Sequence, residues 1–310
     1  MNNIDKEFYG LINNLRKLTL DETFYNIKNS FLLLDDKTKV ALENFFKTFD
    51  YWGTLDYLND DYNEIYEKAQ TLHNHLDDFV WLYERLEDYR SKKVLFAILN
   101  NWYCYDFNNL ESSRETNFSD YFDLDLVKCQ DEVFVDLGAY IGDTIFDYLR
   151  IYGASSYKKI YCYEITPNIF ALLKNNLAKY DNIEFKRKAV SDKNETLYIS
   201  DNSSGPSANT LTNEGENEVT SVTLDDDIED KITTLKMDVE GFEQRAIIGA
   251  SRHIKEDKPK LLISVYHRNE DLIKIPKMID DICPNYKFYL RNNGGGIYPT
   301  EITLIGIPNQ

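Results

Sequence analysis

The spacing of hydrophobic and polar residues changes near residue 130. Before that point apolar positions recur every three or four residues, as in "VALENFFKTF" and "DDFVWLYERLEDYRSKKVLFAILNNWY". This spacing is typical of amphipathic helices, so residues 1–125 are predicted to form a helical amino-terminal region. Residues 126–310 follow a different pattern and are predicted to form a second domain.

Strand-like and helix-like segments alternate through this second domain. Predicted strands are "EVFVDLG", "KKIYCYE", "NIEFKRKAV", "TTLKMDV" and "KLLISVY", with helices predicted up to Tyr152, over 167–180, from Gly241 and around 270–283. The alternation indicates an α/β fold with a parallel sheet. The polar segment "DNSSGPSANTLTNEGENE" is predicted to be a loop. The segments "YKFYLRN" and "EITLIGIP" are predicted to form an antiparallel hairpin at one sheet edge.

Composition narrows the functional classes. The 310 residues carry a formal charge of −18, which would repel a phosphate backbone, so nucleic acid is not expected as a partner. The four cysteines form no CxxC pair, which favours a cytoplasmic location over a disulfide-stabilised secreted protein. Neither a signal-peptide block nor a membrane span is expected. The abundance of Asn, Lys, Ile and Tyr is typical of an AT-rich bacterial genome.

The segment "DEVFVDLGAYIGDT" predicts a strand, a glycine-bearing turn and a helix start. Open α/β folds bind nucleotides at such turns, but the dinucleotide fingerprint GxGxxG is absent between Gly138 and Gly142. Asp136 and Asp143 would disfavour a pyrophosphate and attract a ligand that carries an ammonium and a sulfonium group, which describes S-adenosylmethionine. The alternative is that both carboxylates only bind turn and helix-start amides. Glu164, at the end of the next strand, favours the first interpretation because it can accept hydrogen bonds from ribose hydroxyls.

Four segments together resemble a known family. "VFVDLGAYIGDT", "YCYEITP", "TTLKMDVEGFEQRAIIGA" and "LLISVYHRNEDLIKIP", in this order, resemble the FkbM family of S-adenosylmethionine-dependent methyltransferases over residues 121–308. The resemblance implies the class I Rossmann-like methyltransferase fold, a seven-stranded, mostly parallel sheet with an antiparallel last strand. Many relatives carry a glutamate in the strand where this chain has Ser264.

The resemblance also implies roles for the residues of the turn and of the following strands. The residues implied to hold the methionine part of the cofactor are Asp136, Gly138, Ala139, Tyr140, Gly142 and Thr144, with Asp143 beside them. Glu164 is implied to hold the ribose, and Ala189, Val190 and Ser191, at the end of the third strand, to border the adenine. Tyr121 and Phe122 are candidates to close over the cofactor.

Methyl transfer to a hydroxyl requires a base or a metal ion, because the hydroxyl is a very weak acid. Asp238, Glu240 and His267 are the candidate catalytic residues, since they follow two strands that should end at the same sheet edge. The three residues could bind Mg²⁺ or Mn²⁺, or His267 could act as a general base; a structural hydrogen bond by His267 remains an equal alternative. Glu243 is more simply explained by favourable interactions at a helix start.

The sequence is therefore interpreted as an S-adenosylmethionine-dependent O-methyltransferase. The expected acceptor is a small molecule, a sugar or nucleotide-linked sugar of bacterial surface polysaccharide (capsule or lipopolysaccharide) biosynthesis. The helical region is expected to contribute to the acceptor site or to an oligomer interface. Residues expected to hold a diphosphate are Arg114, Lys128, Arg268 and Arg291. The alternatives are an NAD-dependent oxidoreductase and a catalytically inactive methyltransferase-fold scaffold.

Overall fold

The computed structural model describes residues 2–49, 52–200, 210–212, 215 and 217–309. Contacts divide the chain into two compact units. The helical unit comprises Met1–Thr116, Val265–Ile273 and Phe288–Thr303, and the sheet unit comprises Asn117–Ser264, Lys274–Lys287 and Leu304–Gln310. Two segments of the carboxyl-terminal half therefore belong to the helical unit. The domain boundary expected near residue 125 stays a prediction.

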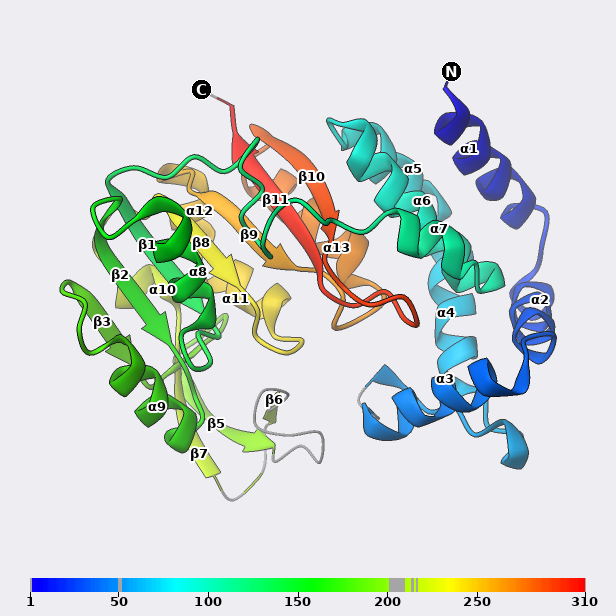
Figure 1. Cartoon of the computed structure of the whole chain (residues 1–310), viewed down its shortest axis with the longest axis horizontal. Coiled ribbons are helices and arrows are strands. Elements are labelled where there is room, and N and C mark those ends of the chain that lie inside the picture. Colours follow the sequence, from blue (N-terminus) through cyan, green and yellow to red (C-terminus); the bar gives the residue numbers. More distant parts are fainter. Residues whose placement is uncertain (1, 50–51, 201–209, 213–214, 216, 310) are drawn as a thin grey trace. The chain divides into compact units, whose positions relative to one another are not determined.

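Helices dominate the amino-terminal part of the helical unit, as the sequence predicts (Figure 1). Polar residues begin several of them: the side chains of Asn2 and Thr19 accept hydrogen bonds from backbone amides of the first turn, in reciprocal capping boxes. Each long helix buries one apolar face, such as Ile27 and Phe31 of the second helix. The helices are α1 (Asn3–Leu15), α2 (Leu20–Leu32), α3 (Asp36–Thr48), α4 (Asn63–Asn74), α5 (Leu76–Arg85), α6 (Tyr89–Cys104) and α7 (Phe107–Ser112), with the short 3₁₀ helix η2 (Tyr57–Asn59).

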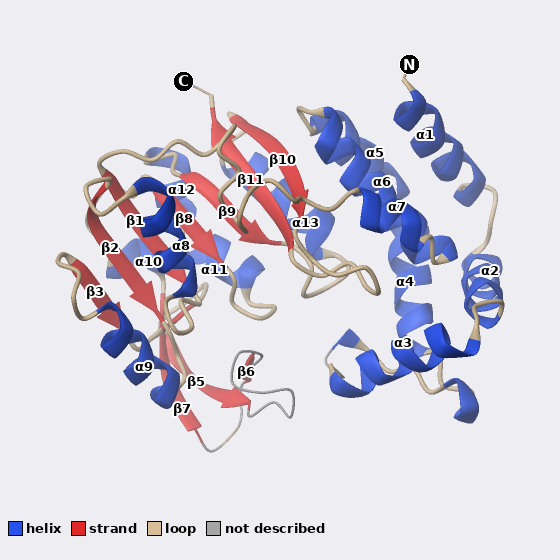
Figure 2. Cartoon of the chain, in the orientation of Figure 1, coloured by secondary structure: helices blue, strands red, loops and turns tan. Residues whose placement is uncertain are grey.

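The main sheet has seven strands, in the order β10-β11-β9-β8-β1-β2-β3 (Figure 2). Its strands are β1 (Glu132–Leu137), β2 (Tyr157–Tyr163), β3 (Ile183–Lys186), β8 (Thr234–Met237), β9 (Lys260–Ser264), β10 (Tyr286–Asn292) and β11 (Ile302–Pro308). The first five strands in this list pair with one another in parallel. The last strand lies between β9 and β10, which confirms the predicted fold class.

Helices connect most of the parallel strands. They are α8 (Asp143–Tyr152), α9 (Pro167–Leu177), α10 (Leu224–Asp227), α11 (Glu243–Gly249), α12 (Ser251–Glu256) and α13 (Asp271–Ile282). Within the described part of the chain, no helix is both long enough and apolar enough to cross a membrane.

A second sheet corrects two sequence predictions. The predicted strand "NIEFKRKAV" is interrupted: β3 ends at Lys186, and β4 (Ala189–Val190) belongs to another sheet, in the order β4-β7-β5-β6. Its other strands are β5 (Glu195–Ser200), β6 (Thr210–Thr212) and β7 (Asn217–Val222). The predicted polar loop 201–218 therefore contains strand residues at 210–212 and 217–218, while 201–209, 213, 214 and 216 lie outside the described residues. Alternate residues such as Leu197 and Val219 bury a small apolar core, which explains why polar segments pair here.

The strand register places four strand ends at one edge of the sheet. Leu137 of β1 lies opposite Tyr163 of β2 and opposite Met237 of β8. Met237 in turn lies opposite Ile263 of β9. Residues that directly follow these strands are therefore neighbours at the carboxyl edge, where open α/β sheets bind their ligands.

Candidate active site

The turn after β1 is built around two glycines. Gly138 has a positive φ of +79°, and a β-carbon there would lie 1.8 Å from the Asp238 carbonyl oxygen. The amides of Gly138 and Ala139 both donate to the Tyr163 carbonyl, at 3.1 and 2.8 Å. Gly142 also has a positive φ, of +91°. Only glycine fits at position 138, because a side chain there would collide with the Asp238 carbonyl group. The backbone of the turn therefore lies close against the end of β8.

The helix after this turn begins where the sequence predicts. Asp143 and Thr144 form the first turn of α8, and Tyr140 in the preceding turn has a positive φ of 44°. A helix start at this place presents free amides to a ligand, and a carboxylate there is favourable for the helix dipole. The cofactor contacts expected of these three residues remain predictions.

Asp136 is fully buried at the end of β1 and faces a lysine. Its Oδ1 lies 3.1 Å from Nζ of Lys236 on the adjacent strand β8. Burial raises the pKa of Asp136 to about 6, although the ammonium group of Lys236 acts in the opposite direction. The sequence suggested that Asp136 either contacts a ligand or binds backbone amides. Neither interpretation included this ion pair. The contact of Asp136 with a cofactor stays a prediction.

Lys236 is a functional candidate that sequence reasoning missed. It is 2% exposed, and its Nζ donates a 2.7 Å hydrogen bond to the Gly138 carbonyl. Burial lowers the pKa of Lys236, but the carboxylates of Asp136 and Asp238 more than offset this effect and hold the pKa above its usual value. The lysine thereby ties the glycine turn to the ends of β1 and β8. Its signal in the sequence is a single charged residue inside the otherwise strand-like "TLKM", directly before Asp238.

Glu164 directly follows β2 and is 8% exposed. Its Oε1 accepts a 2.7 Å hydrogen bond from the Thr166 amide, which fixes the side chain beside the strand end. Burial raises the pKa of Glu164, while backbone hydrogen bonds including those of Thr166 and Tyr140 favour its charged form. Because Leu137 and Tyr163 are in register, Glu164 lies level with the glycine turn.

Asp238 directly follows β8 and is held by a tyrosine. Tyr121 donates a 2.8 Å hydrogen bond to Oδ2 of Asp238 and lies 3.1 Å from Oγ of Ser264, at the end of β9. The Tyr121 ring also lies 5.4 Å from Nζ of Lys236. The expectation that Phe122 closes over a cofactor is wrong: its side chain is fully buried and packs against core aromatic residues of β1 and α8.

Glu240 and Glu243 have different positions in the segment after β8. Glu240 has a positive φ of 52° and is followed by Gly241 with φ 90°, so the chain turns sharply here. Glu243 is fully buried at the start of α11, and its Oε1 accepts a 2.8 Å hydrogen bond from the Val239 amide. The structural interpretation of Glu243 is confirmed.

The residues expected to border an adenine lie in the second sheet. Ala189 and Val190 form β4, and the Ser191 amide donates to the Val222 carbonyl at 2.9 Å. All three are buried. Their placement at the end of the third strand of the main sheet is wrong, because that strand ends at Lys186. Their contact with adenine stays a prediction.

His267 follows β9 by three residues and belongs to the helical unit. Its side chain is 6% exposed and forms part of the wall of a cavity in that unit, to which Tyr266 and Arg268 also contribute. The roles of His267 as a base and as a metal ligand stay predictions, as does its partnership with Asp238 and Glu240.

Arg291 cannot hold a diphosphate as expected. It is 3% exposed, and its guanidinium group bonds Oδ2 of Asp88 at 2.8 Å and Oγ of Ser91 at 3.1 Å. Arg114 forms an ion pair of 3.0 Å with Glu111, and the Lys128 ammonium donates to the Leu124 carbonyl. Of the four expected cations, Arg268 lines the cavity of the helical unit.

Comparisons with known proteins agree with the family resemblance. The family model of the methyltransferase FkbM domain matches residues 136–291, which is 156 of 310 residues and just over half of the chain. A crystal structure of methyltransferase FkbM from Methylobacillus flagellatus is similar over 82% of this chain, with 26% sequence identity and a TM-score of 0.67. The chain spans 63% of the length of that protein.

Two further solved structures are less similar. An rRNA methylase from Streptococcus thermophilus matches 59% of this chain and 90% of its own, with 13% identity and a TM-score of 0.38. A fibrillarin from Aeropyrum pernix, solved with S-adenosyl-L-methionine, matches 58% of this chain and 67% of its own, with 12% identity and a TM-score of 0.38. Similarity at this level supports no functional inference. None of the curated proteins matches the chain significantly.

Proposed function

Because the chain belongs to the FkbM methyltransferase family, we propose that it transfers a methyl group from S-adenosylmethionine to a hydroxyl oxygen of a small molecule. The proposed acceptor is a sugar or a nucleotide-linked sugar of bacterial surface polysaccharide biosynthesis. The observation that carries the proposal is the common sheet edge at which the glycine turn, Glu164 and Asp238 follow three strands in register. Such an edge is where α/β folds bind nucleotide ligands.

The charge at this edge suits a cationic cofactor. Burial raises the pKa of Asp120, and the negative charges of Asp147, Asp238 and Asp143 raise it further. This accumulation of carboxylates would stabilise the ammonium and sulfonium groups of S-adenosylmethionine and would repel a dinucleotide pyrophosphate. In this proposal the turn 138–142 and Thr144 hold the methionine part, and Glu164 holds the ribose.

Asp238 is proposed to act on the acceptor. When bound, S-adenosylmethionine supplies an activated methyl group, whose bond to sulfur breaks as a bond to the acceptor oxygen forms. Asp238 would orient the hydroxyl, and its proton would pass to Asp238 or His267, so that a methyl ether and S-adenosylhomocysteine remain. Tyr121 fixes the Asp238 carboxylate by its 2.8 Å hydrogen bond, which would limit the cost of ordering it during the reaction.

A divalent ion is the alternative to a protein base. Asp238 and Glu240 offer the oxygen ligands that Mg²⁺ and Mn²⁺ prefer, and His267 is the proposed third ligand. The ion would bind the acceptor oxygen and lower the pKa of its hydroxyl. Loss of turnover after chelation, with recovery on adding Mg²⁺ or Mn²⁺, would support this role. Full turnover after exhaustive chelation would assign proton transfer to the side chains alone.

Replacement of Glu164 by alanine is expected to weaken S-adenosylmethionine binding by about 1.5–3 kcal/mol, the scale of hydrogen bonds to a charged group. Isothermal titration calorimetry measures this change directly. Glu229→Ala, which removes an exposed carboxylate of the same unit, is the matched control and should bind normally. Unchanged affinity in Glu164→Ala would remove this residue from the cofactor site.

A methyl-transfer screen tests the proposed function. The protein is incubated with S-adenosylmethionine and a panel of sugars, nucleotide-linked sugars and other hydroxylated metabolites, and products are detected by mass spectrometry. The proposal expects a methyl ether at a hydroxyl oxygen. Transfer found only to a protein, a nucleic acid, a nitrogen atom or a carboxylate would contradict it.

A further inference from the structure

The helical unit contains a cavity of about 570 Å³. All of its lining residues belong to this unit. They come from α4 and the adjacent His75, from Trp52, from residues 266–270 after β9, and from Tyr298 between β10 and β11. Its volume lies within the range of about 300–1,000 Å³ that is typical of small-molecule sites. The cavity thus brings together residues from the range 52–75 and residues from the range 266–298, which are more than 190 positions apart in the sequence.

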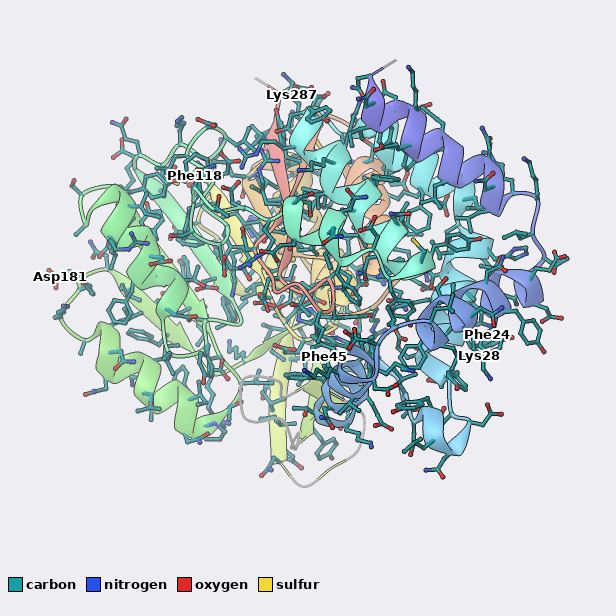
Figure 3. The ribbon with its side chains drawn as sticks, turned by 45° about the vertical axis from the view of Figure 1, so that its right-hand side comes forward. Phe24, Lys28, Phe45, Phe118, Asp181 and Lys287 are labelled. Atoms are coloured by element: carbon teal, nitrogen blue, oxygen red, sulfur yellow. The ribbon has the colours of Figure 1, made fainter. Side chains whose placement is uncertain are left out.

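Three aromatic residues give the cavity an apolar wall. The rings of Trp52 and Tyr298 lie 5.7 Å apart and 30° from parallel, and Tyr266 meets Trp52 edge-on at 6.1 Å. Phe45 of α3, labelled in Figure 3, stacks on Trp52 at 5.3 Å. The buried Lys68 ammonium lies 4.8 Å from the centre of the Tyr298 ring. These rings pack against one another and give the cavity one apolar side.

Side-chain amides supply the polar groups of the cavity. Gln70 and Asn74 of α4 line it together with Asn269, whose Oδ1 accepts a 3.4 Å hydrogen bond from Tyr298. Each amide offers donors and an acceptor at once, which matches a hydroxyl group, itself both donor and acceptor. Flat rings beside amides suit a ligand with an apolar ring face and a hydroxylated edge, which describes a sugar.

The charges around the cavity disfavour a phosphorylated ligand. The carboxylates of Glu67 and Glu270 both line it. Arg268 is the single arginine among the lining residues, and His75 already contacts Asp78 at 2.7 Å and Glu270 at 3.9 Å. A diphosphate carries several negative charges and would be repelled by the two carboxylates.

We propose that this cavity binds the methyl acceptor as an uncharged sugar unit, packed against the aromatic wall formed by Trp52, Tyr266 and Tyr298 and hydrogen-bonded by Gln70 and Asn74. The proposal rests on the proposed function and narrows its acceptor from sugars in general to those without a nucleotide diphosphate. His267, the proposed base, lies in the wall of the same cavity.

Saturation-transfer NMR and calorimetry on the full chain test this site without requiring turnover. The probes are a panel of neutral monosaccharides and disaccharides, including lactose and cellobiose, with UDP-glucose as the charged probe; all are measured with S-adenosylhomocysteine present. We expect neutral sugars to bind and Gln70→Met and Asn74→Leu each to weaken them about five-fold, as expected for one lost neutral hydrogen bond. Asn13→Leu, an exposed amide of α1 outside the cavity, is the matched control and should bind normally.

A charge variant provides a second, independent readout. Glu67→Gln combined with Glu270→Gln should tighten UDP-glucose binding several-fold while leaving the neutral sugars nearly unchanged, because the amides still offer acceptors. Absence of binding by every neutral probe, or binding that Gln70→Met and Asn74→Leu leave intact, would overturn the proposal. S-adenosylhomocysteine is titrated into each protein before any sugar is added and reports separately on the proposed function, so the two failures are distinguishable.

Discussion

Asp238→Ala is expected to lower kcat at least about 100-fold, the range of losses seen when a general acid or base is removed. The carboxylate lies at the end of β8 beside the glycine turn, and its partner Tyr121 holds it in one orientation. S-adenosylhomocysteine binding should largely survive, because the proposed role of Asp238 is toward the acceptor. Steady-state kinetics together with calorimetry on the same variant separate the two effects.

Two further variants distinguish a catalytic role of Asp238 from a structural one. Asp238→Asn keeps an oxygen that can accept from Tyr121 but removes the charge, so it should fold normally and remain nearly inactive. Tyr121→Phe removes the hydroxyl that orients Asp238 and contacts Ser264 but leaves the Asp238 carboxylate, and we expect a smaller loss of kcat, about ten-fold. An Asp238→Ala protein that retained most of its kcat would exclude this residue from catalysis.

Lys236→Met is expected to lower the free energy of unfolding by about 1–2 kcal/mol at pH 7. The buried Asp136 loses its ion partner and must take up a proton, which costs about 1.4 kcal/mol for each pH unit above its pKa of about 6. Chemical denaturation followed by circular dichroism measures the change. The double variant Asp136→Leu with Lys236→Met removes both charges and should recover most of the lost stability, since well-packed apolar pairs can replace buried ion pairs. A double variant no more stable than Lys236→Met would argue that packing, not the unpaired charge, causes the loss.

The same pair predicts a pH dependence. The pKa of Asp136 is raised to about 6 from an unfolded value near 3.8, so its contribution to stability is fully present below pH 3.8 and is lost as the pH rises through about 6. Without Lys236 the pKa of Asp136 should rise further. The stability gap between the wild type and Lys236→Met should therefore be small at pH 5 and widen above pH 6. A gap that stays constant between pH 5 and pH 8 would contradict the ion pair as its cause.

The local pattern of apolar and polar residues was sufficient to predict the site residues that directly follow strands. The alternation of apolar strands with helices implies parallel order, and parallel order places Gly138, Glu164 and Asp238 at one edge, as the register confirms. Glu243 was also interpreted correctly, because a carboxylate in the first turn of a helix has a local partner. Each of these predictions used the pattern of residues within a single strand, turn or helix start.

Long-range pairing explains what the sequence did not reveal. Lys236 and Arg291 would be expected at the surface, because long charged side chains are seldom fully buried without a partner. Their partners, Asp136 and Asp88, lie 100 and 203 residues away along the chain. The strands of the second sheet are short and polar on one side, so their pairing too depends on contacts that local periodicity does not record.

Binding of S-adenosylmethionine is the central claim about this protein, and one titration tests it most directly. S-adenosylhomocysteine and NAD are titrated separately into the intact protein by isothermal calorimetry. The account predicts saturable binding of S-adenosylhomocysteine with one site per chain and no detectable binding of NAD. Binding of NAD but not of S-adenosylhomocysteine would indicate an oxidoreductase. Failure to bind either ligand would indicate an inactive scaffold. Each of these results would contradict a methyltransferase site at the ends of β1, β2 and β8.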